Sequence, residues 1–145
     1  MRAVLREADR ARLRAHAEAG YPDEVCGFLL GSMEASARSF DVREIRPAMN
    51  RRASRASRRY RIDPAEYRAA EREAEEKGLE LVGIYHSHPD APAVPSRYDR
   101  EHAWPNSAYV IVPVRAGRAW EPRAWLLAED RSGFDELGTF EGKGG

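Results

Sequence analysis

The sequence holds only two lysines, one cysteine and no long apolar run. The last two features exclude several classes of protein. Cys26 is the only cysteine among 145 residues, so the chain can form no internal disulfide and no structural zinc site built on several cysteines. No apolar run approaches the roughly 20 residues that span a bilayer. Residues 1–7 lack the apolar segment of a signal peptide. We therefore expect a cytoplasmic protein without a membrane partner.

Charge is abundant but balanced. The chain carries 24 basic and 24 acidic residues, a formal net charge of zero, so no global field attracts nucleic acid. Six arginines gather in the segment Arg51–Arg61, where we expect a surface loop. No aromatic residue interleaves with them before Tyr60, which argues against nucleic acid. The loop is either simply solvated or docks an acidic protein substrate.

Length and periodicity predict one α/β domain over residues 1–145, with a flexible tail at 140–145. Start and stop signals, such as the N-cap Asp63 followed by Pro64 and Glu66, predict helices that alternate with β-rich runs. The order implies a mixed sheet with flanking helices. The expected helices are 7–19, 63–78 and 96–103, and the expected strands are 24–31, 38–46, 79–86, 108–114, 118–128 and 134–140.

The strand at 79–86 leads into two histidines, His86 and His88. Alternate side chains of a strand share a face, so the two imidazoles point the same way, about 7 Å apart at roughly 3.3 Å of rise per residue. A proline-rich loop follows and delivers Ser96 and Asp99. Two imidazoles and a carboxylate suit one Zn²⁺ ion per chain, with the fourth position left for water. Ser96-x-x-Asp99 is also a helix capping box, and a cap would aim Asp99 at the metal.

The pattern His86-x-His88, seven residues, Ser96, two residues, Asp99 resembles the metal motif of the JAMM (MPN+) metalloprotease family. Chance would produce it in roughly 3 of 10,000 sequences of this composition, which makes it stronger than most short motifs. The family's upstream glutamate matches Glu24, ahead of the apolar run that ends at Gly31. The resemblance implies a three-layer JAMM/MPN architecture, a mixed β-sheet with flanking helices related to that of the cytidine deaminases, with His86, His88 and Asp99 as metal ligands.

By the same resemblance, Glu24 is the general acid and base, and Ser96 donates a hydrogen bond to the developing oxyanion. The implied reaction is cleavage of a peptide or isopeptide bond after the C-terminal Gly-Gly of a ubiquitin-like or sulfur carrier protein. Its implied partner is a carrier with a Gly-Gly tail. The alternatives without a function are an exposed carboxylate at Glu24 and an ordinary strand surface at the two histidines.

Two rival functions stay open at this point, and a third is excluded. A non-catalytic MPN scaffold would share the fold, although such members usually lack the metal residues. A zinc peptidase acting on unrelated peptides, such as cell-wall fragments, is a further alternative. A zinc deaminase needs His-x-Glu and Pro-Cys-x-x-Cys, and this sequence has neither.

Several features leave two interpretations. Cys26 stands two residues from Glu24, so it is either a buried small hydrophobe or a group near the metal. The terminal Gly144-Gly145 resembles the tails that the family cleaves after, and chance or a cloning remnant is the simpler explanation. The late strands would permit a homodimer.

Overall fold

The structure is a computed structural model that describes residues 1–34, 39–49 and 62–141. The basic segment Arg51–Arg61 and the pair Gly144-Gly145 lie outside the described residues, so the expectations for them stay predictions. Within the described residues, none of the helices is both long and apolar enough to cross a membrane. The elements are β1 (Arg2–Val4), α1 (Glu7–Gly20), β2 (Cys26–Glu34), β3 (Ser39–Ala48), α2 (Pro64–Glu76), β4 (Glu80–Pro89), α3 (Arg97–His102), β5 (Ala108–Arg115), β6 (Arg118–Ala119), β7 (Arg123–Leu127) and β8 (Phe134–Phe140).

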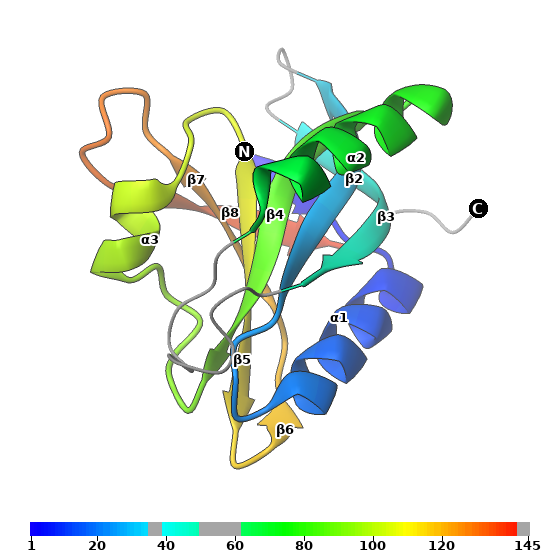
Figure 1. Cartoon of the computed structure of the whole chain (residues 1–145). Coiled ribbons are helices and arrows are strands. Elements are labelled where there is room, and N and C mark those ends of the chain that lie inside the picture. Colours follow the sequence, from blue (N-terminus) through cyan, green and yellow to red (C-terminus); the bar gives the residue numbers. More distant parts are fainter. Residues whose placement is uncertain (35–38, 50–61, 142–145) are drawn as a thin grey trace.

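The eight strands of the described residues join one sheet in the order β4-β2-β3-β1-β8-β7-β5-β6. β4 also pairs with β5 in parallel, from Gly83↔Ala108 to Pro89↔Val114, and this pairing closes the sheet into a barrel-like ring (Figure 1). The α/β class with a mixed sheet is confirmed, but the expected three-layer arrangement is replaced by the ring. The β4–β5 pairing joins distant parts of the chain, and local periodicity carries no signal of it.

The helices cover two different regions of this ring. α1 contacts β3, β5 and β6, whereas α2 contacts β2 and β4. Leu13 of α1 belongs to one core cluster together with Tyr85 of β4, and Ala70 of α2 belongs to a second cluster with Ile84. Neighbouring residues of β4 therefore face opposite cores, as the period of two requires. His86 and His88 share the face of Ile84, the face that α2 covers.

Most element predictions are confirmed, with instructive differences. The three-residue strand β1 was missed, although it joins β3 to β8 in parallel. Pro47 lies inside β3 and does not end it. Proline has no N–H to donate, so it is tolerated where one edge of a strand is unpaired. β1 pairs with β3 only as far as Asp41, so Pro47 is paired on the β2 side and not with β1. The expected strand 118–128 is divided into β6 and β7 around Pro122. Gly27 lies against the Tyr85 ring, with which a Cβ at this position would collide.

The closure of the ring should be sensitive to Gly83→Ala. A Cβ at Gly83 would lie well inside van der Waals contact of the Ala108 carbonyl oxygen, in backbone that cannot move aside without opening the β4–β5 ladder. We expect the free energy of unfolding to fall by about 1–3 kcal/mol, as in other overpacked sites. Denaturant unfolding measures this. The matched control is Gly133→Ala, where a Cβ meets nothing within 4 Å. Equal stability of both variants would contradict the account of closure.

Candidate metal centre

Two histidines converge from β4, a strand with hydrogen-bonded neighbours on both edges. β4 runs through both of them and is paired on one side with β2 and on the other with β5, so their backbone is fixed from both edges. His86 is fully buried and His88 is 8% exposed. Their Nε2 atoms lie 3.1 Å apart and their ring centroids 4.9 Å apart, closer than the strand spacing alone predicts, because the rings tilt toward each other.

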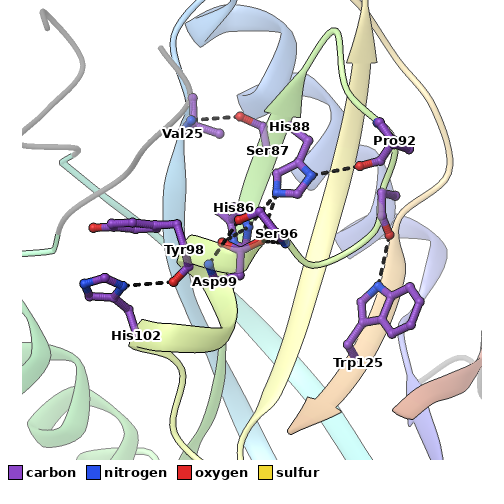
Figure 2. Close-up of polar contacts among 11 residues, drawn as sticks. Val25, His86, Ser87, His88, Pro92, Ser96, Tyr98, Asp99, His102 and Trp125 are labelled. Atoms are coloured by element: carbon purple, nitrogen blue, oxygen red, sulfur yellow. Dashed lines mark hydrogen bonds and ion pairs between the residues drawn. The ribbon is translucent and has the colours of Figure 1, made fainter. Parts of the chain in front are cut away.

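Asp99 reaches the same point from the first turn of α3. Ser96 is the N-cap of that helix: its hydroxyl accepts the Asp99 N–H at 3.0 Å, and the Asp99 carboxylate accepts the Ser96 N–H at 2.8 Å. The predicted capping box is therefore confirmed. It aims Asp99 so that its two oxygens lie 3.2 Å from His86 Nε2 and 3.1 Å from His88 Nε2 (Figure 2).

Hydrogen bonds and burial set the orientation and the pKa values of the groups in this cluster. His88 Nδ1 lies 2.8 Å from the Pro92 carbonyl oxygen, which can only accept, so Nδ1 carries a proton and Nε2 is the ring nitrogen that can bind a metal ion. Burial lowers the pKa of His86 and keeps its ring neutral at pH 7. Burial alone would raise the pKa of Asp99, but His86, His88 and the Ser96 N–H hold it below the usual range.

This donor set fits a metal ion. With bonds of about 2.0–2.1 Å, the ligand atoms of a tetrahedral zinc lie about 3.3 Å apart. The two Nε2 atoms lie 3.1 Å apart, close to that edge, and each has an Asp99 oxygen nearby, Oδ1 at 3.2 Å from His86 and Oδ2 at 3.1 Å from His88.

Glu24 belongs to the same cluster from a different element. It precedes β2, is only 2% exposed, and offers a carboxylate oxygen within 4.8 Å of the ligand atoms of His86 and His88. The exposed-carboxylate alternative is therefore wrong. From this position the Glu24 carboxylate could contact a water molecule bound to an ion at the Asp99 side.

A buried serine that the sequence analysis overlooked positions Glu24. Ser87, between the two histidines, accepts the Val25 N–H at 2.9 Å through its hydroxyl, and its own N–H donates to the Val25 carbonyl at 3.0 Å. The residue after Glu24 is thus fixed to the strand that carries the histidines. Strand alternation could have located Ser87, since it must face away from the imidazoles.

A cavity of about 450 Å³ opens onto this cluster, lined by Glu24, His88, Ser96 and the loop between them. The loop is fixed at two points. The Trp125 indole N–H donates to the Ala93 carbonyl at 3.0 Å, and the Asp90 carboxylate accepts both the Tyr21 hydroxyl and the Ala116 N–H. These distant partners could not be read from the sequence, because each joins a loop residue to another element.

Two side chains near the site have simpler roles. Cys26 is fully buried, and burial raises the pKa of its thiol to about 12. It is a neutral buried thiol within an apolar cluster, as the small-hydrophobe interpretation requires. His102 is exposed and stacks on Tyr98, with ring centroids 4.0 Å apart.

The structure thus brings all five predicted site residues, Glu24, His86, His88, Ser96 and Asp99, around one buried cluster and its cavity. The geometry separates them into a tight trio and two flanking groups. The roles assigned to them stay proposals.

Comparisons with known proteins show the family of this chain. Residues 6–128 match the model of the prokaryotic homologues of the JAB domain. The chain is 37% identical over 108 residues to the desampylase of Pyrococcus furiosus, covering 73% of this chain and 68% of that protein. It is 38% identical over 116 residues to the CysO-cysteine peptidase of Mycobacterium tuberculosis, covering 79% of this chain and 75% of that protein.

A solved structure extends the likeness along nearly the whole chain. The solution structure of a Salinibacter ruber protein is 40% identical with a TM-score of 0.74, covering 99% of this chain and 92% of that one. The family match covers well over half of the chain, and the resemblance found in the sequence is confirmed. The chain belongs to the family of prokaryotic homologues of the JAB domain.

Proposed function

We propose that this protein is a zinc metalloprotease that cleaves the peptide or isopeptide bond after the C-terminal Gly-Gly of a ubiquitin-like or sulfur carrier protein. The observation that carries the proposal is the Asp99 carboxylate, 3.1–3.2 Å from two converging imidazole nitrogens, with Glu24 beside them. The names of the relatives, a desampylase and a CysO-cysteine peptidase, support a carrier-linked substrate. The single buried thiol is compatible with action in the cytoplasm.

His86 Nε2, His88 Nε2 and an Asp99 oxygen would hold the zinc ion. When bound, zinc lowers the pKa of a coordinated water to about 7 and polarises the scissile carbonyl. The Glu24 carboxylate takes the proton from the attacking water and passes it to the leaving amine as the C–N bond breaks. The Ser96 hydroxyl donates a hydrogen bond to the carbonyl oxygen as its charge develops, a contribution of about 3 kcal/mol where the geometry is good.

The low exposure of Glu24 has a chemical consequence. A carboxylate that is 2% exposed and faces the cavity exchanges protons with a bound water and a bound amine in preference to bulk solvent. A non-catalytic scaffold has no need of such a buried carboxylate beside two imidazoles. A peptidase of unrelated peptides would need the same residues, so only a choice of substrates separates that rival from the proposal.

We expect zinc-loaded protein to cut small carriers that bear a Gly-Gly–amino-acid extension, and a zinc chelator to stop the reaction. The measurement is the product mass, with and without chelator, for carrier adducts and for unrelated peptides such as cell-wall fragments. Cleavage after Gly-Gly only in carriers is the predicted result. Cleavage of unrelated peptides with intact carriers would favour the general peptidase, and inert zinc-loaded protein would favour the scaffold.

Glu24→Gln should bind zinc normally and turn over at least about 100-fold more slowly, because the amide can neither accept nor return the proton. Zinc content and kcat are measured on the same preparation. Glu76→Gln, on the exposed end of α2, is the control and should behave as the wild type. Wild-type turnover by Glu24→Gln would remove the proposed role of Glu24.

His88→Ala should lose most of the bound zinc, since one of three ligands is gone. His102→Ala, an equally small change at an exposed histidine, should keep one zinc per chain. Because a ligand that binds only the folded state raises the melting temperature, added zinc should stabilise the wild type and His102→Ala but not His88→Ala. A fully loaded His88→Ala protein would show that the ion is held elsewhere.

A further inference from the structure

The proposed function fixes the direction in which a substrate lies across the site, and the inference below rests on it. Glu24 gives its proton to the leaving amine, so the leaving group must occupy the cavity that Glu24 lines together with His88 and Ser96. The acyl part is the tail of the carrier protein. It must extend from the reacting carbonyl in the other direction, on the far side of Ser96.

A second cavity, of about 400 Å³, lies on that side. Residues 94–96 line both cavities and form the wall between them. The other lining residues include Trp125 and Phe134 as apolar surface and two arginines of α3, Arg97 and Arg100. No acidic residue is among the described residues that line it. We name this cavity the α3 groove.

The positive charge of the α3 groove is only partly neutralised. The Arg97 guanidinium pairs with Glu101 of the same helix at 3.0 Å. Arg100 makes no ion pair with any residue in the described part of the chain, and its side chain is exposed. A third cation, Arg131, donates to the backbone carbonyls of Arg100 and Ala103 at 2.9 and 2.8 Å, which holds the helix in place and adds to the local charge.

We propose that the α3 groove binds the C-terminal tail of the carrier protein, and that Arg100 with Arg97 selects tails with Asp or Glu shortly before Gly-Gly. An extended chain advances about 3.3 Å per residue, so the two glycines cover about 7 Å from the reacting carbonyl. The residues that precede them then reach the arginines of the first turns of α3. The apolar surface of Trp125 and Phe134 contacts the extended backbone, and the guanidiniums pair with the acidic side chains.

The chain offers a matched rival surface on the other side. Arg115 and Arg118 flank the exposed Trp120, with their guanidinium carbons 6.0 and 5.5 Å from its ring centroid. This surface adjoins the leaving-group cavity, since the Ala116 N–H donates to Asp90. Because both surfaces hold exposed arginines, charge reversal at one or the other tells which side the carrier tail occupies.

The test measures binding of two free carriers that end in Gly-Gly, one with acidic residues at the preceding positions and one with Asn or Gln there. Free carriers contain no bond to cleave, so the result is independent of catalysis. Dissociation constants are measured for the wild type, Arg100→Glu, Arg100→Gln and Arg118→Glu at low and high salt. Cleavage of the corresponding carrier adducts by the wild type is followed separately.

The wild type should bind the acidic tail about fivefold more tightly at low salt, the scale of an exposed ion pair, and the preference should shrink as salt screens it. Arg100→Gln should lose the preference, Arg100→Glu should reverse it, and Arg118→Glu should retain it. Equal binding of both tails, binding of neither, or a preference lost only in Arg118→Glu would overturn the inference. Selective binding without any adduct cleavage would instead count against the proposed function.

Discussion

The structure depends on one constraint: the metal-binding atoms of three side chains are held together in a buried place. The Nε2 atoms of His86 and His88 lie 3.1 Å apart, and each has an Asp99 oxygen 3.1–3.2 Å away. Such a cluster persists only if the surrounding fold holds each member rigidly, and it then becomes a site that favours a divalent ion.

Each part of the fold meets this requirement in its own way. The ring closes at β4–β5, so the strand with the histidines has hydrogen-bonded neighbours on both edges. The capping box that begins α3 also orients the Asp99 carboxylate. The intervening loop is fixed by Trp125 and Tyr21, and Ser87 fixes the approach to Glu24. The same interactions that stabilise the domain therefore position the chemistry.

The sequence predicted the site better than the architecture, for physical reasons. His86 and His88 are positioned by strand alternation, and Ser96 and Asp99 by helix capping, and both are local rules. The closure of the ring, the strand β1 and the fixed loop around Asp90 depend on contacts between distant residues, which leave no periodic trace in one sequence.

The homodimer stays a prediction, although β8 is flanked by β7 and β1 and offers little free edge for it. Trp104 and Trp120 are 66% and 51% exposed, so neither belongs to the core, whereas Trp125 does.

The central claim concerns which atoms hold the ion, and an anomalous-scattering crystal structure of the zinc-loaded protein tests it most directly. The account predicts one zinc at about 2.0–2.2 Å from His86 Nε2, His88 Nε2 and an Asp99 oxygen, with water in the fourth position and Glu24 contacting that water. Zinc bound through Glu24 in place of Asp99, through Cys26, or at a site without the two histidines would contradict it.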